Sequence, residues 1–136
     1  MPRLSNVLPA LVLALAGCAA GSDGFHLVSG MITTGGPSMR VEEVPMDSIR
    51  LRDELWVITK VSWEPETLDT GPHAVQWNVS TGASVVYTDA LRVNLNHSPY
   101  AIWHRTLPGV LGPGHYSVEV LIDGELIDTE SFEITP

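Results

Sequence analysis

The chain has 136 residues, enough for one domain of common size beside a short leader. Sixteen acidic residues against seven basic ones give a formal net charge of −9, a sign that repels phosphate backbones and argues against nucleic-acid binding. Cys18 is the only cysteine, so no intrachain disulfide can form and the fold must depend on its hydrophobic core.

An apolar run from Val7 to Gly17 ends directly before Cys18. Its length suits the hydrophobic region of an export signal and falls well short of the ~20 residues that a membrane-spanning helix needs. Arg3 supplies the positive charge that precedes such a region, and the small residue Ala16 suits a peptidase that approaches the backbone closely. The run therefore predicts a cleaved, helical signal peptide over residues 1–17.

The segment Leu15-Ala16-Gly17-Cys18 resembles the lipobox of bacterial lipoproteins. The resemblance implies that a lipid is attached to the Cys18 sulfur, that the chain is cut before this cysteine, and that the new N-terminus is acylated. It places the protein in the cell envelope, in contact with a membrane through its anchor. Ala19 stands where the retention signal of such lipoproteins is usually Asp, so the resemblance points to the outer membrane. The alternative is an ordinary secretory signal without lipidation.

Cleavage before Cys18 would leave 119 residues with a net charge of −10. Residues 18–24 comprise this cysteine and a small, polar stretch that predicts a flexible tether. From Phe25 to Pro136, short segments rich in β-branched and aromatic residues alternate with Gly, Pro, Asn and Asp clusters. No segment there shows a 3.6-residue apolar period over ten residues, so the sequence predicts one all-β domain over residues 25–136.

The predicted strands share period-2 alternation or a run of strand-forming residues between turn signals. They are His26–Thr33, Met39–Val44, Glu54–Ser62, His73–Val79, Ser84–Tyr87, Leu91–Leu95, Ala101–Leu107, His115–Ile122 and Leu126–Ile134. In the fourth, Val75, Trp77 and Val79 share one face, and Gln76 and Asn78 share the other. One apolar and one polar face per strand is typical of antiparallel sheets, and seven to nine strands predict an antiparallel β-sandwich.

The C-terminal quarter shows the clearest hairpin. Asp123-Gly124 lies between two alternating runs, which is a strong signal for a tight turn. The segment from Pro113 to Val120, this turn and Phe132-Glu133-Ile134 resemble the closing hairpin of immunoglobulin-like and fibronectin-III-like domains. The resemblance implies an immunoglobulin-like fold without its paired cysteines, and it implies no functional residues. Tyr116 is expected to face the core with its hydroxyl on a backbone carbonyl, as in a tyrosine corner.

Motifs of catalysis and cofactor binding are absent from the sequence. Lys60, the only lysine, follows no Gly-rich loop, and there is no Gly-x-Ser-x-Gly, His-Glu-x-x-His or Cys-x-x-Cys. We therefore assign no catalytic residue, no metal ligand and no cofactor, and predict that the protein is not an enzyme. An active site could still form from side chains on strands that lie far apart in the sequence.

Two groups of titratable residues could attract a ligand but have simpler interpretations. The five histidines contain no His-x-His pair and are predicted to be solvated or turn residues: His26, His73, His97, His104 and His115. The acidic segment with Glu64, Glu66 and Asp69 is predicted to be a solvated loop, with cation binding as the alternative.

Four tryptophans are the strongest functional signal in the domain. Trp63 and Trp77 fall on apolar strand faces and are predicted to lie in the core. Trp56 and Trp103 share their faces with charged or polar residues, so these two and Tyr100 are candidate binding residues, with burial in the core as the alternative. Exposed aromatic side chains stack on sugars and anchor protein interfaces.

Two functions follow from these observations. The first is a lipid-anchored envelope protein that acts as a non-catalytic binding or structural module for a protein partner. The second is a carbohydrate- or peptidoglycan-contacting module that uses exposed aromatics. An envelope enzyme is less favoured. The sequence leaves the partner, the membrane leaflet and the oligomeric state open.

Overall fold

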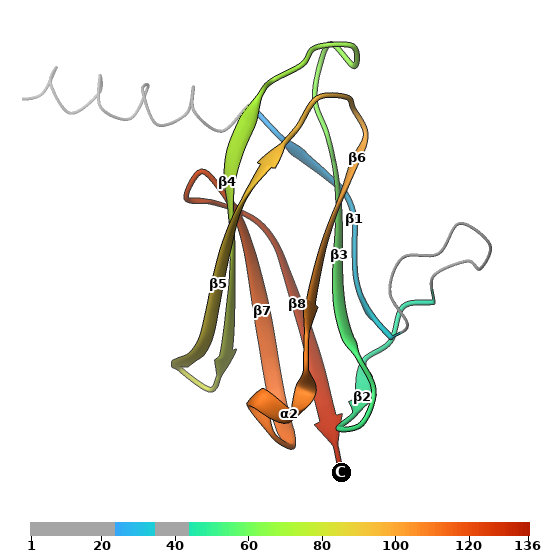
Figure 1. The fold of residues 1–136 in the computed structure, drawn as a ribbon, viewed down its shortest axis with the longest axis vertical. Coiled ribbons are helices and arrows are strands. Elements are labelled where there is room, and N and C mark those ends of the chain that lie inside the picture. Colours follow the sequence, from blue (N-terminus) through green and yellow to red (C-terminus); the bar gives the residue numbers. More distant parts are fainter. Residues whose placement is uncertain (1–23, 35–43) are drawn as a thin grey trace, which may run out of the picture.

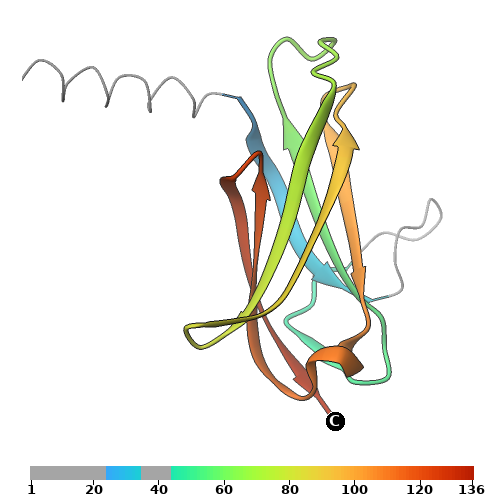
Figure 2. The same cartoon turned by 60° about the vertical axis from the view of Figure 1, so that its left-hand side comes forward.

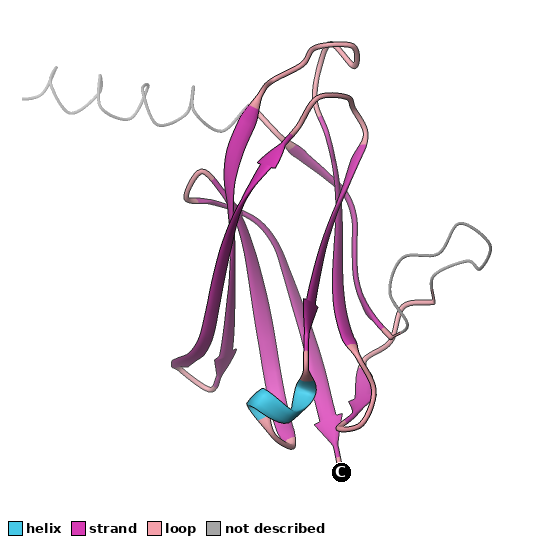
Figure 3. Ribbon diagram, in the orientation of Figure 1, coloured by secondary structure: helices cyan, strands magenta, loops and turns pink. Residues whose placement is uncertain are grey.

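A computed structural model describes residues 24–34 and 44–136. Most of the described chain is β-strand, beside one four-residue helix, α2 (Pro108–Leu111) (Figure 3). The predicted signal peptide, Cys18 and nearly all of the tether lie outside the described residues. So do residues 39–43 of one predicted strand, whose last residue, Val44, belongs to no strand. No helix among the described residues has the length and apolar character needed to cross a membrane.

The strands form two sheets that face each other (Figures 1 and 2). The three-stranded sheet has the order β1-β3-β6 and contains β1 (His26–Thr33), β3 (Leu55–Ser62) and β6 (Tyr100–Thr106). The five-stranded sheet has the order β2-β8-β7-β4-β5 and contains β2 (Ser48–Arg50), β8 (Glu125–Thr135), β7 (Gly114–Ile122), β4 (Pro72–Thr81) and β5 (Ser84–Asn94). All neighbours are antiparallel except β2, which runs parallel to β8. The protein is an immunoglobulin-like β-sandwich, as predicted.

Apart from Val44, the predicted elements differ from the structure in three main places. The predicted segment Ser84–Tyr87 and residues 91–94 of the segment Leu91–Leu95 belong to one continuous strand, β5, because the residues between them also pair with β4. The short strand β2 was missed, since three residues are too few to show a period. Helix α2 was missed because it begins at Pro108 within a Gly- and Pro-rich stretch that is also typical of turns.

The core lies between the sheets and is built from alternate residues of the strands. Trp77 and Trp63 are 1% and 3% exposed, which confirms both core predictions. A buried indole removes on the order of 200 Å² from water, which contributes about 5 kcal/mol at ~25 cal/mol per Å² before the entropy cost of folding is counted. These two tryptophans therefore account for a large part of the core.

The closing hairpin has the predicted turn and the predicted tyrosine corner. Asp123 and Gly124 adopt φ angles of 51° and 84°, the positive values that a two-residue type I′ turn requires. Tyr116 is 9% exposed, and its hydroxyl donates to the backbone oxygens of Leu111 at 2.6 Å and Gly112 at 2.9 Å. The hydroxyl thereby fixes the C-terminal end of α2 against β7.

Candidate functional site

The outer face of the three-stranded sheet carries two of the candidate binding residues. Along β3, Leu55 and Val57 point to the core, and Trp56 between them points outward. Trp103 on β6 lies in register with Ile58, two residues beyond Trp56. The two indoles are therefore diagonal neighbours on adjacent strands, within reach of each other, and both are half-buried.

Ile58 lies at the centre of this outer face. It points away from the core, yet it is only 4% exposed. Met31 on β1 and Trp103 on β6 are its register neighbours. An outward side chain on an antiparallel sheet is normally polar and wet, so an apolar row of Met31, Ile58 and Trp103 departs from the usual pattern.

Charged groups border this apolar row. The Trp56 Nε1–H donates to Glu54 Oε2 at 2.8 Å, and Arg105 contacts Glu54 Oε1 at 3.3 Å. Glu54 therefore orients the Trp56 ring and neutralises Arg105 at the same time. Lys60, one outward position beyond Ile58, is exposed. An apolar centre with a charged rim is the usual composition of a protein-binding surface.

Tyr100 lies on the opposite face of the same sheet. It is in register with Val61, which is fully buried, and it packs against the core. Its ring also lies 5.2 Å from that of His97. Because side chains alternate along a strand, residues 100 and 103 face opposite ways although they are close in sequence. The structure therefore brings Trp56 and Trp103 together and separates Tyr100 from them.

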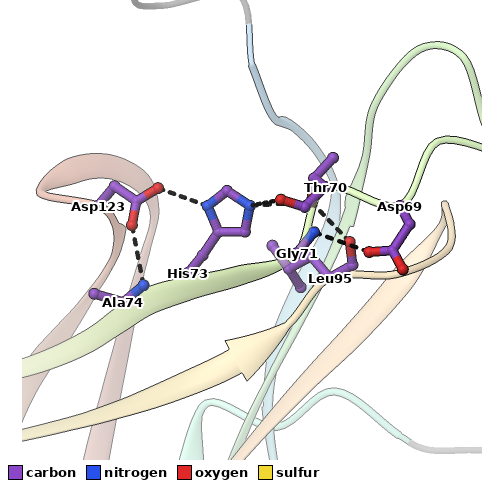
Figure 4. A network of polar contacts seen from close by, with 7 residues as sticks. All are labelled: Asp69, Thr70, Gly71, His73, Ala74, Leu95 and Asp123. Atoms are coloured by element: carbon purple, nitrogen blue, oxygen red, sulfur yellow. Dashed lines mark hydrogen bonds and ion pairs between the residues drawn. The ribbon is translucent and has the colours of Figure 1, made fainter.

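A polar network connects three segments at the end of the sandwich opposite α2 (Figure 4). The His73 Nδ1 lies 2.6 Å from Asp123 Oδ2, and its Nε2 lies 3.0 Å from the Thr70 hydroxyl and 3.1 Å from the Thr70 backbone oxygen. The Thr70 hydroxyl itself donates to Leu95 O at 2.7 Å. Both ring nitrogens thus lie within hydrogen-bond distance of oxygen atoms from neighbouring segments.

The same ring also contacts the first described residues. Phe25 lies edge-on to His73 at 4.9 Å and to Trp63 at 5.5 Å. Asp123 accepts a second hydrogen bond from the Ala74 N–H at 3.0 Å. The network therefore ties the β7–β8 turn, the start of β4 and the entry of the chain into β1 to one another.

His104 corrects the prediction that the histidines are solvated or turn residues. It is 8% exposed, and it stacks on Trp77 with ring centres 4.5 Å apart. Its Nε2 contacts Asp89 Oδ2 at 2.9 Å, and its Nδ1 faces the Thr106 hydroxyl at 3.2 Å. The hydrogen bond from His104 lowers the pKa of Asp89 despite partial burial. The ring is buried because it stacks on Trp77 in the core.

The other titratable candidates lie as expected. His26, His97 and His115 are exposed, and so are Glu64, Glu66 and Asp69 of the acidic loop. The described residues contain no group of three or more His, Cys, Asp and Glu side chains placed to hold a metal ion.

Two carboxyl groups were missed by the sequence reasoning. Asp128 and Glu130 lie on the core side of β8, in register with the buried residues Val120 and Val118. Their position in the sequence could have revealed them, because residues two apart on a strand share a face. Asp128 and Glu130 therefore share the face of Phe132 and Ile134 on the predicted strand Leu126–Ile134. An acidic side chain on an otherwise apolar strand face is the feature to look for.

Comparisons with known proteins bear on the fold alone. The sequence matches no known family and no curated protein. The structure is similar to the alkylpurine DNA glycosylase AlkC of Pseudomonas fluorescens, with a TM-score of 0.55 and 15% identity over 87% of this chain. The match spans only 32% of the glycosylase.

Two smaller proteins are also similar. An immunoglobulin-like protein from Pseudomonas aeruginosa matches with a TM-score of 0.47 and 11% identity, over 84% of this chain and 99% of that one. The CARDB domain of a Pyrococcus furiosus protein, solved with di-metal ions, matches with a TM-score of 0.42 and 10% identity, over 79% and 93% of the two chains. At such identities a shared fold carries no function across.

Proposed function

We propose that this protein is a lipid-anchored, non-catalytic module of the cell envelope that binds a protein partner through the outer face of its three-stranded sheet. One observation carries the proposal: Trp56 and Trp103 lie half-buried on that face, side by side around Ile58. Tryptophan is among the residues that contribute most to protein interfaces, particularly where charged neighbours surround an apolar centre.

The anchor is supported by the segment Leu15-Ala16-Gly17-Cys18, which ends the apolar run. Cys18→Ser should leave an uncleaved precursor that incorporates no fatty acid. Mass spectrometry of the N-terminal peptide, together with fatty-acid labelling, measures both effects. Separation of the two membranes on a density gradient then tests the outer-membrane assignment that Ala19 suggests. Normally processed, unlipidated protein from the unmutated gene would contradict the anchor.

Binding is tested by cross-linking in intact cells, followed by purification of the chain and identification of what is attached. The double variant Trp56→Ala/Trp103→Ala should lose the cross-linked partner. A matched double variant on the outer face of the five-stranded sheet, Gln76→Ala/Thr88→Ala, should keep it. Loss of the partner in both variants, or in neither, contradicts the assignment of the binding face.

A carbohydrate ligand is the second candidate, because two neighbouring indole rings on a sheet can stack on successive sugar rings. Cosedimentation of the purified chain with insoluble peptidoglycan separates the two ideas. If the chain cosediments with peptidoglycan, and if Trp56→Ala and Trp103→Ala each weaken this binding, the result favours a carbohydrate ligand. Absence of cosedimentation, with a protein cross-link retained, favours the protein partner.

A further inference from the structure

The edge of the sandwich where β8 lies beside β1 contains an acidic pair that points inward. Asp128 is 8% exposed, and its register partner Val120 is fully buried. Glu130, two residues along the same strand, lies in register with the fully buried Val118. Both carboxyl groups therefore lie on the core side of β8. This location is independent of the outer aromatic face.

Gly30 on β1 provides the space for both carboxyl groups. A Cβ atom at this position would lie 1.8 Å from Asp128 Oδ2 and 2.7 Å from Glu130 Oε1. Any other residue would collide with the pair. The two carboxyl groups thus meet over a glycine, within a few ångströms of each other.

Thr59 on β3 brings a third oxygen to the same place. It is in register with Gly30, fully buried, and on the core side of its strand. Paired residues hold their Cβ positions about 4.5–5.5 Å apart. Since Asp128 Oδ2 lies 1.8 Å from the Cβ position of Gly30, the Thr59 side chain lies on the same side of the sheet, next to the place that this carboxyl group occupies. Among the described residues, neither Thr59 Oγ1 nor Asp128 Oδ2 has a hydrogen-bond partner, although nearly all buried polar atoms have one.

No positive side chain balances the pair within the described part of the chain, where none of the ion pairs involves Asp128 or Glu130. Burial raises the pKa of Asp128. Burial also raises the pKa of Glu130, to about 7, with the negative charge of Asp128 as the next cause. Two adjacent, poorly hydrated carboxylates need a counter-charge, which is either a shared proton or a cation.

We propose that Asp128, Glu130 and Thr59 bind a hard divalent cation, Ca²⁺ in preference to Mg²⁺, which joins β8 to β1 and β3. All three donors are oxygen atoms, and two carboxylates balance a double positive charge. Ca²⁺ accepts irregular geometry and completes its shell with water, whereas Mg²⁺ demands a near-ideal octahedron. Glu130 also lines a shallow cleft with residues 44–48, which gives the ion a route from solvent.

The test uses the purified full chain after treatment with a chelator. Ca²⁺ should raise its melting temperature with a dissociation constant of about 10⁻⁴–10⁻³ M, the range of weak extracellular sites. Mg²⁺ should act more weakly. Tb³⁺ should also bind, with luminescence sensitised by the tryptophans and displaced by Ca²⁺. Circular dichroism at each step shows that the chain stays folded.

Variants distinguish specific Ca²⁺ binding at Asp128 and Glu130 from nonspecific attraction of cations to an acidic protein. Glu130→Gln should weaken Ca²⁺ binding at least about tenfold, and Thr59→Val should weaken it less. Glu119→Gln, on the outer face of β7, is the matched control and should change nothing. Equal losses in the Glu119 and Glu130 variants would overturn the site. A wild-type melting temperature unchanged by about 10 mM Ca²⁺, well above the expected dissociation constant, would show that the pair holds only a proton or water.

Discussion

The tryptophans within the strands face the core in the five-stranded sheet and face outward in the three-stranded sheet, whereas Trp63, directly after β3, lies in the core. In the five-stranded sheet, Trp77 faces the core and is 1% exposed. In the three-stranded sheet, Trp56 and Trp103 face away from the core and are half-buried. The same residue type therefore stabilises the fold in one sheet and forms a surface in the other. Only the second arrangement requires an explanation beyond folding.

The outer face of the five-stranded sheet shows what an ordinary solvated face looks like. Gln76 Nε2 donates to Asn78 Oδ1 at 2.9 Å, and the Thr88 hydroxyl donates to the same oxygen at 3.2 Å. Such a face satisfies its own polar groups and needs no partner. The outer face of the three-stranded sheet departs from this pattern, because it carries two half-buried indoles and the apolar Ile58, and we therefore place the candidate binding face on the smaller sheet.

The comparison is tested most strongly by removing equal side chains from the two sheets. Trp77→Ala should lower the free energy of unfolding by about 3–5 kcal/mol, because it leaves a cavity in the core. Trp103→Ala should cost only about 1 kcal/mol, since its ring keeps partial contact with water. Urea unfolding of both variants measures the difference. Equal costs would mean that Trp103 is part of the core.

Iodide quenching of single-tryptophan variants checks the same placement without relying on stability. A chain that retains only Trp103, or only Trp56, should be quenched. A chain that retains only Trp77 should be protected, because its indole lies between the sheets. Equal protection of all three would remove the main support for a binding face.

Tyr116 gives the next largest effect and tests the inward aromatics of the five-stranded sheet. Tyr116→Ala should cost about 3 kcal/mol or more through the cavity beside Phe132, with which it stacks at 5.7 Å. Tyr116→Phe should cost about 1 kcal/mol, because only the hydrogen bond to the C-terminal end of α2 is lost. A neutral Tyr116→Ala in equilibrium unfolding would contradict its inward placement.

Much of this fold can be predicted from period-2 alternation, and the reason is visible in β4. Its central inward residues Val75, Trp77 and Val79 are 0–3% exposed and the residues between them are not buried, so the pattern of burial there repeats the pattern of polarity. The prediction failed in β5, where inward residues such as Leu91 are 58% exposed. β5 is the edge strand of the five-stranded sheet and extends beyond the three-stranded sheet, so the opposite sheet does not cover these inward side chains. The number of strands in the opposite sheet cannot be read from the local sequence of β5.

The candidate site was predictable in part. Parity along the strands was enough to separate Trp56 and Trp103 from their core-facing neighbours. The pairing of β3 with β6, which sets the two indoles side by side, depends on register between strands far apart in sequence. The meeting of Asp128 with Gly30 depends on contact between the edges of two sheets, which no local pattern encodes.

The smallest predicted effect concerns the end of the sandwich where the two sheets meet around His73 and Phe25. Burial alone would raise the pKa of Asp123. Hydrogen bonds from His73 and the Ala74 N–H, with the charges of His73 and Arg92, outweigh burial and bring the pKa below its ordinary value. The Asp123 carboxylate therefore stabilises the fold above about pH 4, and this contribution is lost as the pH falls through the lowered pKa.

Asp123→Asn isolates this contribution, because Asn also tolerates the positive φ that the turn requires. At neutral pH the variant should be less stable than the wild type by under about 1 kcal/mol, since the Asp123 side chain is 54% exposed and solvent screens the pair. Near pH 2 the two proteins should unfold at the same urea concentration, because both side chains are then neutral. Glu125→Gln, on the other side of the same turn, is the control and should show no such dependence. A stability difference that does not change with pH would mean that the turn, and not the charge of Asp123, holds this end of the two sheets together.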